Sequence, residues 1–228
     1  MPARLRPTAP VAADAILVGD PGRALMLAQE LLEQPKMSNH ARGLWGYSGE
    51  TPAGRPLTIQ STGMGGPSAS VVLQDLAELG LRRAIRIGTC TALWHELELG
   101  QTTIVSETFP EPGGSYQPPE GSEEPDQVVI EPNPRLTHRL SNALLGEAIG
   151  VVSVSLDVLH RPELEVHPAA EVADMQTAAL FATGREFEVA VAAILIVTQT
   201  RDGRALADER LEVAAKRAGR AAAHVFST

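Results

Sequence analysis

Short apolar runs alternate with amphipathic segments along most of the chain. Residues 15–18 form an unbroken apolar run, and the residues that follow place apolar side chains three and four positions apart as far as Leu32. The run predicts a buried strand and the spacing predicts a helix. Because this order of strand, turn and helix recurs downstream, the pattern predicts an α/β fold.

The remaining elements follow from the same two periodicities. Two strand-like runs joined by a Pro/Gly turn in 44–62 predict a hairpin. Five further strands are predicted, at "RAIRIG", "TTIVSE", "QVVIEP" and "VAVAAILIVTQ" and in "GVVSVSLDVLH", where the strand runs into a loop. Helices are predicted over 67–79, 134–148, 170–187 and 206–226, with Gly80 ending the first of them and Pro134 beginning the second. The length of 228 residues predicts a single domain over 1–228.

The segment 109–126, "FPEPGGSYQPPEGSEEPD", departs from both patterns. It is rich in proline, glycine and acidic residues and has too little apolar surface to order itself. It predicts a mobile surface loop or lid, and a solvated insertion without a function explains the composition equally well.

Composition narrows the class of partner. The chain has 19 Lys and Arg against 28 Asp and Glu, a formal net charge of -9, which disfavours a nucleic-acid or anionic membrane partner. No apolar run approaches the roughly 20 residues of a membrane span, so we expect a cytoplasmic protein. Cys90 is the only cysteine, which excludes an intrachain disulfide and a cysteine-based zinc site, and we expect no metal.

Three strand ends carry small residues: "VGDPGR", "STGMGGPS" and "RIGTC". Ligands of α/β proteins bind where strands end, and backbone N–H groups at Gly19 and before Pro67 are placed to hold an anion at a helix start. Arg23 follows the first turn, and Arg86 lies in an otherwise apolar strand. A bound oxyanion explains both arginines together. Tight turns without a ligand, with a buried ion pair for Arg86, remain an alternative.

Four motifs together resemble a known family. "GDPGR", "ARGLWGYSG", "STGMGGPSAS" and "RIGTC" occur here in an order and spacing similar to those of the bacterial hexameric purine nucleoside phosphorylases and uridine phosphorylases. The first hundred residues match closely and the second half more loosely. The resemblance implies a single-domain, three-layer α/β/α fold around a mixed central β-sheet.

The resemblance also implies a reaction. Inorganic phosphate, as co-substrate and without any cofactor, would attack the anomeric carbon of a nucleoside, with purines preferred, and release the base and a pentose 1-phosphate. The implied phosphate-binding residues are Gly19, Arg23, Arg42, Arg86 and Thr89. Arg42 would reach the site of a neighbouring subunit in a hexamer built as a trimer of dimers. Met64 would pack beneath the ribose.

The second half departs from the family pattern. Where the family has Glu-Met-Glu, this chain has Asp174-Met175-Gln176. The resemblance places Met175 and Gln176 at the ribose and Asp174 towards the base. The amide of Gln176 can bond to a hydroxyl but lacks the negative charge that stabilises a cationic transition state. Altered ribose chemistry is therefore an open possibility.

The base-binding residues match less regularly. Gln199 stands where several purine enzymes place an acidic residue, and an amide is no general acid. Asp202 would replace it only after a shift of the loop, and Arg210 matches the assisting arginine with a two-residue offset or is an exposed helix residue. The base pocket would also contain Cys90, Leu159 and His160, the last of which is otherwise a surface histidine. The N-terminal histidine of the family has no counterpart; Arg4 or Arg6 would have to replace it.

Several activities remain open at this point. A nucleoside phosphorylase directed at purines accounts for all four motifs. A uridine phosphorylase is the nearest alternative, although the glutamine and arginine that read uracil are not evident. A hydrolase that uses water would leave Arg23 and Arg86 without a phosphate. A paralogue that binds nucleoside or phosphate without efficient turnover is favoured by Gln176 and Gln199 and opposed by the arginines.

Overall fold

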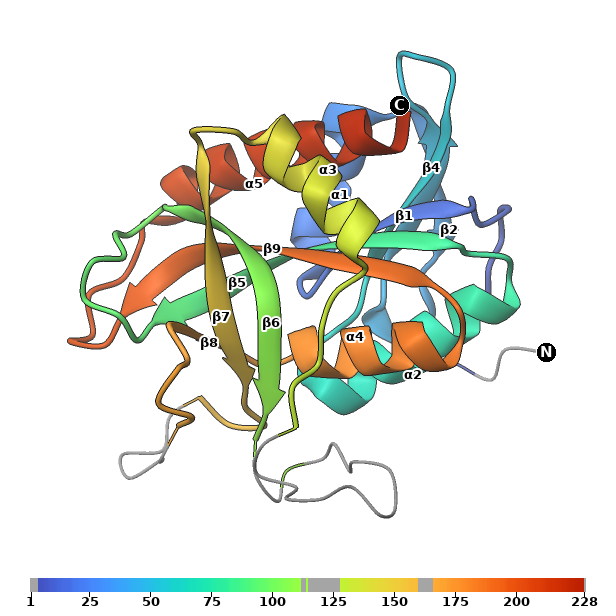
Figure 1. Ribbon diagram of the computed structural model, residues 1–228. Coiled ribbons are helices and arrows are strands. Elements are labelled where there is room, and N and C mark those ends of the chain that lie inside the picture. Colours follow the sequence, from blue (N-terminus) through green and yellow to red (C-terminus); the bar gives the residue numbers. More distant parts are fainter. Residues whose placement is uncertain (1–3, 112–113, 115–127, 160–165, 228) are drawn as a thin grey trace.

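The computed structural model describes residues 4–111, 114, 128–159 and 166–227 (Figure 1). Nine strands form its sheet: β1 (Asp14–Val18), β2 (Glu33–Asn39), β3 (Gly46–Glu50), β4 (Pro56–Ser61), β5 (Arg83–Ala92), β6 (Thr102–Pro110), β7 (Ala148–Ser155), β8 (Val172–Asp174) and β9 (Ala190–Thr200). Five α-helices accompany them: α1 (Pro21–Leu31), α2 (Gly66–Glu78), α3 (Pro134–Ala143), α4 (Thr177–Glu186) and α5 (Asp208–Ser227). A 3₁₀ turn, η1, spans Ala41–Gly43.

The sheet is mixed and partly closed. The strand order is β2-β3-β4-β1-β5-β8-β7-β6-β9, and an additional pairing joins β5 to β9. The strands β5, β8, β7, β6 and β9 therefore form a ring, to which β1, β4, β3 and β2 add an open extension. β1 runs parallel to both β4 and β5, so the carboxyl ends of these three strands meet at one edge.

Helices cover the sheet on both faces. In Figure 1, α1, α3 and α5 lie on one side and α2 and α4 on the other, with the sheet between them. Side chains alternate along β1: Ile16 packs into the cluster under α1, α3 and α5, and Leu17 packs into the cluster under α2 and α4. The three-layer arrangement around a mixed sheet agrees with the prediction. No helix among the described residues has both the length and the apolar character needed to cross a bilayer.

Most predicted elements are present, with four differences. The helix predicted over 170–187 begins at Thr177, because Val172–Asp174 pairs with β5 and β7 as β8. The strand predicted at 127–132 is wrong among its described residues, where Ile130 forms a single bridge to Thr108. The helix predicted over 134–148 ends at Ala143, and 148–155 belongs to β7.

The fourth difference is β2, which was not predicted. It is an edge strand whose first five residues are mostly exposed, and its pairing with β3 contains two register shifts. An exposed and irregular strand has neither an apolar run nor a clean alternation, so the sequence carries little signal for it. Most of the loop predicted over 109–126 lies outside the described residues.

Candidate functional site

The three motif-bearing strand ends lie side by side. In the register of the sheet, Val18 of β1 pairs with Ser61 of β4, and Leu17 pairs with Arg86 of β5. The contact continues past the strands, because the backbone N–H of Thr62 donates to the carbonyl of Val18 at 2.7 Å. The turns after β1 and β4 and the side chain of Arg86 therefore share one edge of the sheet, as the sequence predicted for a ligand site.

The first turn delivers a helix N-terminus to this edge. Asp20 is the N-cap of α1 and accepts the backbone N–H of Arg23 at 2.7 Å, with Pro21 in the first turn. Gly19 lies against the second turn, since a Cβ built on it would be 3.4 Å from the carbonyl oxygen of Gly63. Arg23 itself is half-buried.

Three residues at the junction of β8 and α4 bind the side chain of Arg86. Its side chain is 5% exposed, and its Nη2 donates to Oδ2 of Asp174 at 2.8 Å. Its Nη1 donates to Oε1 of Gln176 at 2.6 Å, and its Nε donates to Oγ1 of Thr177 at 3.3 Å. The buried ion pair that the sequence left open as an explanation of Arg86 is thus present.

Asp174 is fully buried and accepts several donors besides Arg86. Ser155 Oγ donates to its Oδ1 at 2.6 Å, and Thr177 Oγ1 donates to its Oδ2 at 2.7 Å. The backbone N–H groups of Gln176 and Thr177 also donate to it. Asp174 therefore fixes the guanidinium of Arg86 in one orientation.

The ion pair does not use the full donor capacity of Arg86. A guanidinium carries five N–H groups, and the three hydrogen bonds of Arg86 to described residues engage one each on Nε, Nη1 and Nη2. One further N–H remains on each of the two terminal nitrogens. A buried donor without a partner is costly, so an anion that accepts these two groups would be bound favourably.

A second arginine contributes to the same electrostatic environment. Burial lowers the pKa of Arg23 below its ordinary value; the carboxylate of Asp20 opposes this change, and the positive charge of Arg86 adds to it. Arg23 and Arg86 are therefore near enough to repel each other. An oxyanion between two such guanidinium groups would relieve that repulsion. The structure brings these two predicted residues together, with Gly19 beside them.

Gln176 lies between Arg86 and the glycine-rich loop after β4. Its Nε2 donates to the carbonyl oxygens of Gly63 at 2.7 Å and Gly65 at 3.2 Å. Oγ1 of Thr62 lies 3.1 Å from its Oε1. Only 3% of Gln176 is exposed. That it bonds to ribose hydroxyls stays a prediction.

The other predicted phosphate and ribose residues are less enclosed. Met64, flanked by glycines with φ of +72° and +79°, is 86% exposed, and Met175 is half-buried. Thr89 is half-buried and, by strand alternation, points to the opposite face of β5 from Arg86. Arg42 is exposed in the turn η1 with φ of 59°. Their roles stay predictions.

The two residues proposed from the sequence as catalytic occupy different surroundings. Gln199 is half-buried near the end of β9, where it pairs with Thr91 of β5. Arg210 is exposed, and its Nη2 donates to the carbonyl oxygen of Leu99 in the turn before β6. Asp202 is exposed and pairs with Arg204 at 3.0 Å. The structure therefore gives Arg210 and Asp202 partners outside the Arg23 and Arg86 cluster.

Of the other residues predicted to bind the base, the structure describes Cys90 and Leu159, which have different surroundings. Cys90 is buried, and burial raises the pKa of its thiol; the charge of Asp174 raises it further and Arg86 opposes this. Leu159 packs against a small apolar cluster that contains Phe109, Val154 and Leu156. His160 lies outside the described residues.

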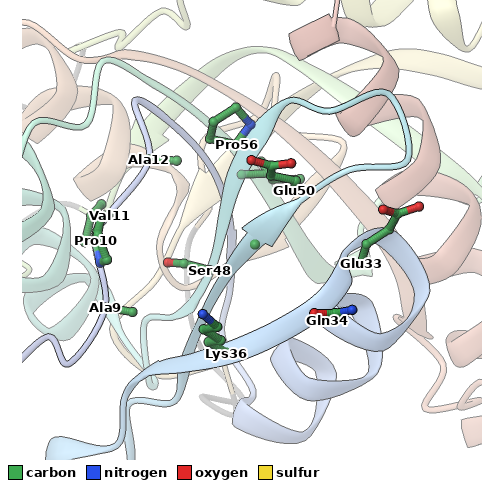
Figure 2. A pocket seen from close by; sticks show the side chains of 12 residues that line it. Ala9, Pro10, Val11, Ala12, Glu33, Gln34, Lys36, Ser48, Glu50 and Pro56 are labelled. Carbon is green, nitrogen blue, oxygen red and sulfur yellow. The ribbon is translucent and has the colours of Figure 1, made fainter.

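One cavity lies away from the predicted site residues. This cavity of about 560 Å³ is formed by β2, β3, β4 and the segment Ala9 to Ala12, with Lys36, Ser48 and Glu50 around it (Figure 2). None of the predicted site residues that the structure describes lines it. A second cavity, of about 380 Å³, lies beyond the ends of β5 and β9 beside Trp94 and Thr200, next to Gln199.

Sequence reasoning missed the residues that orient the predicted ones. Thr62, Ser155 and Thr177 hold Gln176 and Asp174, and Gly88 leaves room for the guanidinium of Arg86. The position of Gly88 could have been interpreted from the sequence. Residues two apart in a strand share a face, so a glycine two positions after Arg86 leaves space for its side chain. The hydroxyl residues carried no such signal, since they come from elements far apart in the sequence.

Comparison with known proteins places these features in context. The model of a family described as the phosphorylase superfamily matches residues 14–227. A uridine phosphorylase of Treponema pallidum is 30% identical over 212 residues, which cover 85% of this chain and 80% of that protein. A DeoD-type purine nucleoside phosphorylase of Oceanobacillus iheyensis is 42% identical over 89 residues, 38% of this chain and 37% of that protein. The match thus spans under two fifths of the latter.

Two solved structures share the fold. A purine nucleoside phosphorylase of Toxoplasma gondii, in complex with immucillin-H, superimposes with a TM-score of 0.82 at 22% identity, over 95% of this chain and 92% of that one. A uridine phosphorylase of Phytophthora capsici superimposes with a TM-score of 0.81 at 20% identity, over 98% of this chain and 92% of that one. At these identities the similarity concerns the arrangement of helices and strands.

Proposed function

We propose that this chain, which belongs to the phosphorylase superfamily, is a nucleoside phosphorylase that transfers the pentose of a nucleoside to inorganic phosphate. The observation that carries the proposal is that the turn leading to Arg23 and the side chain of Arg86 lie at the same edge of the sheet, beside the glycine-rich turn after β4. Asp174 and Gln176 hold Arg86 so that two of its N–H groups have no acceptor among the described residues. Phosphate offers acceptors for both arginines at once.

The chemistry that this site can perform is an in-line displacement. A phosphate oxygen forms a bond to the anomeric carbon while the bond from that carbon to the base nitrogen breaks, and its electron pair leaves with the base. Arg23 and Arg86 orient the nucleophile and compensate its charge, which reduces the entropic cost of the encounter. The phosphate in turn stabilises the positive charge that develops on the sugar.

The base is handled by groups at the ends of β5 and β9. The amide of Gln199 can donate a hydrogen bond to a departing base but cannot supply a proton. The base would therefore take its proton from solvent. We propose Cys90 and Leu159 as part of the wall of this pocket.

A second subunit completes the site in this proposal. Arg42 is exposed on a 3₁₀ turn and has a positive φ, an unusual conformation for a residue with a side chain. Such strain is found at functional positions, and an arginine exposed at a turn can reach a neighbouring molecule. We propose that Arg42 enters the phosphate site of a partner in a symmetric oligomer assembled from dimers.

Purine nucleosides are the proposed substrates, and uridine is the second candidate. The observation that favours purines is a local match of 42% identity over 89 residues to a purine nucleoside phosphorylase. The observation that favours uridine is the longer match, because the uridine phosphorylase of Treponema pallidum aligns over 85% of this chain. Both activities transfer a pentose to phosphate and differ in the base that is released, so the proposed phosphate site fits either one.

A substrate panel tests the proposal. Purified protein is incubated with inosine, guanosine, adenosine or uridine, with and without phosphate, and the free base and pentose 1-phosphate are measured. We expect release of base that depends on phosphate, with a purine nucleoside consumed fastest. Equal release without phosphate would indicate hydrolysis, and binding without turnover would indicate an inactive paralogue; either result contradicts the proposal.

Substitution of Arg86 links the activity to the site. Arg86→Ala is expected to weaken phosphate affinity about 100-fold, because it removes charge-assisted hydrogen bonds to the anion. Arg204→Ala is the matched control, since Arg204 is an exposed arginine paired with Asp202. An unchanged phosphate titration in Arg86→Ala would remove Arg86 from the site.

A further inference from the structure

We infer that Gln176 is a positioning residue: its amide tethers the glycine-rich loop 62–65 to Arg86 and is not available to recognise the sugar. The inference rests on the proposed function only for the identity of the bound anion. Its basis is the set of four polar contacts that surround one side-chain amide in the interior of the protein.

The neighbours of Gln176 fix the orientation of its side-chain amide. The carbonyl oxygens of Gly63 and Gly65 only accept hydrogen bonds, and Nη1 of Arg86 only donates. The Gln176 nitrogen must therefore face the two glycines, at 2.7 Å and 3.2 Å, and the oxygen must face Arg86, at 2.6 Å. The reversed amide would place like groups against each other on both sides. The surroundings thus permit a single orientation.

The amide of Gln176 has little capacity left for another partner, although the single proton of Thr62 Oγ1 is shared between the carbonyl of Val18 and Oε1 of Gln176, both at 3.1 Å. Both N–H groups of Gln176 are used by the loop, and its oxygen accepts from Arg86 with Oγ1 of Thr62 at 3.1 Å. An amide offers two donors and two acceptor positions. A sugar hydroxyl can accept from Gln176 only by displacing a glycine carbonyl, and one that donates to Oε1 competes with Thr62. The 3% exposure of the residue leaves little room for such an exchange.

The glycine-rich loop 62–65 depends on the hydrogen bonds from Gln176 for its conformation. Gly63 and Gly65 both have positive φ, so this stretch has a conformation that few other residues adopt and that glycine does not enforce. Ser68 Oγ donates to the carbonyl of Thr62 at 2.6 Å and secures one end of the loop. Gln176 secures the Gly63–Gly65 part. It thereby fixes the loop and the guanidinium of Arg86 relative to each other.

A glutamate at this position would act differently. Its carboxylate can accept from Arg86 and Thr62, but it has no proton to donate to the carbonyls of Gly63 and Gly65 and would repel them. It would also add a second negative charge beside Arg86, in competition with a bound anion. The inference therefore predicts that Gln176→Glu releases the loop and weakens phosphate binding.

The experiment uses Gln176→Glu and the similarly shaped Gln176→Met in the full-length protein, each checked for native secondary structure by circular dichroism. Hydrogen exchange of the peptide that contains 62–66 is expected to accelerate about tenfold in both variants, from the loss of two hydrogen bonds. Phosphate affinity, titrated by calorimetry without nucleoside, is expected to fall about tenfold in Gln176→Glu. Both measurements are independent of turnover, so they decide the inference even if no nucleoside is a substrate.

Activity separates positioning from sugar recognition. If the proposed function holds, each variant is expected to lower kcat/KM by the same factor for inosine and 2′-deoxyinosine. A loss more than about fivefold larger for inosine would mean that Gln176 reads the sugar hydroxyl, and it would overturn the inference. Unchanged exchange at 62–66 would overturn it too. A crystal structure of the wild-type protein with phosphate and nucleoside bound provides a check without substitution, and a contact between Gln176 and a sugar hydroxyl there would refute the tether.

Discussion

The guanidinium of Arg86 lies directly over Gly88, two residues along the same strand. A Cβ built on Gly88 would be 2.6 Å from both Cζ and Nη2 of Arg86 and 2.8 Å from Cδ2 of Leu195. Side chains two apart in a strand point to the same face, so any residue larger than glycine at 88 would occupy the space that the guanidinium uses. The absence of a side chain at Gly88 is therefore part of how Arg86 reaches Asp174.

Gly88→Ala is the first test of this arrangement. The added methyl group must displace either Arg86 or Leu195 in a closely packed interior, and we expect the free energy of unfolding in urea to fall by about 1–3 kcal/mol. Phosphate affinity should fall as well, because the two remaining N–H groups of Arg86 would be redirected. Gly150→Ala is the matched control: it is also a strand glycine, and a Cβ there meets nothing within 4 Å. Equal stability of the two variants would contradict the geometry.

Asp174→Asn tests the buried ion pair. The substitution keeps the shape of the side chain but removes the charge that compensates Arg86, and it exchanges an acceptor for an N–H group in a site full of donors. Breaking a buried pair in this way is expected to lower the free energy of unfolding by about 3–5 kcal/mol. Chemical denaturation followed by circular dichroism measures the change.

The control for Asp174→Asn is another aspartate paired with an arginine. Asp202 lies 3.0 Å from Arg204, but both side chains are more than half exposed. Surface pairs contribute little to stability, so Asp202→Asn should unfold at the same urea concentration as the wild-type protein, within error. If the two substitutions had similar effects, burial of the Arg86 and Asp174 pair would not be the cause of its stabilising role.

The layers of this fold follow from the sequence wherever a segment is buried on both faces. β9 is a long apolar run, and β5 is mainly apolar around Arg86, as expected of strands in the interior of a sheet, and both were predicted. β2 was missed because an edge strand is exposed and irregular. The helix predicted over 170–187 failed at its start, because Asp174 is taken into the sheet as the partner of Arg86 and Ser155.

In the candidate site, the positions of the strand ends could be predicted from the sequence, whereas the side-chain partners could not. Arg23, Arg86 and Gly19 were predicted to converge because turns after neighbouring parallel strands share an edge, a rule that needs no coordinates. That rule does not predict which side chain pairs with Arg86. Asp174 lies 88 positions away in the sequence, and its pairing with Arg86 depends on how β8 enters the sheet between β5 and β7. The contacts of Gln176 with Gly63 and Gly65, more than 110 positions away, were for the same reason not predicted.

The buried thiol of Cys90 is expected to make the free energy of unfolding depend on pH. Burial, with the charge of Asp174, raises the pKa of this thiol in the folded protein, whereas in the unfolded chain it ionises near its ordinary value of about 8.5. The unfolded state therefore binds fewer protons than the folded state above that pH, and stability must fall as pH rises. We expect the free energy of unfolding to decrease between about pH 8.5 and 9.5 with a slope of up to about 1.4 kcal/mol per pH unit.

The measurement is urea denaturation across that range for the wild-type protein and for Cys90→Ala, which lacks the thiol. The slope should be smaller in the variant, and identical slopes would show that Cys90 does not contribute. A reagent for thiols provides a second readout: native protein at pH 8 should react only on unfolding, because the thiolate is the reactive form and is suppressed by burial. Rapid reaction of the native protein would contradict the raised pKa.

Arg42 gives a prediction on assembly. If it completes the phosphate site of a partner subunit while Arg23 serves its own, then Arg42→Ala and Arg23→Ala should each abolish activity through different chains of a dimer. A mixed dimer then contains one site with both arginines intact and one site with neither. Refolding the two inactive variants together in equal amounts should restore about a quarter of the wild-type activity per chain, as expected for random pairing across a two-fold symmetric interface.

The logic of this test depends on which chain supplies each arginine. If Arg42 acted within its own subunit, every site in the mixture would lack one of the two arginines, and no activity would return. Mixing the two variants without unfolding them controls for subunit exchange. Refolding Arg42→Ala together with Arg204→Ala controls for the refolding step. Arg204 suits this purpose because its side chain is exposed and, among the described residues, pairs with Asp202 in the neighbouring turn. That second mixture should keep activity in the sites that have a wild-type Arg42 opposite them. Recovery in the control but none with Arg23→Ala would place Arg42 in the same chain as the phosphate it binds.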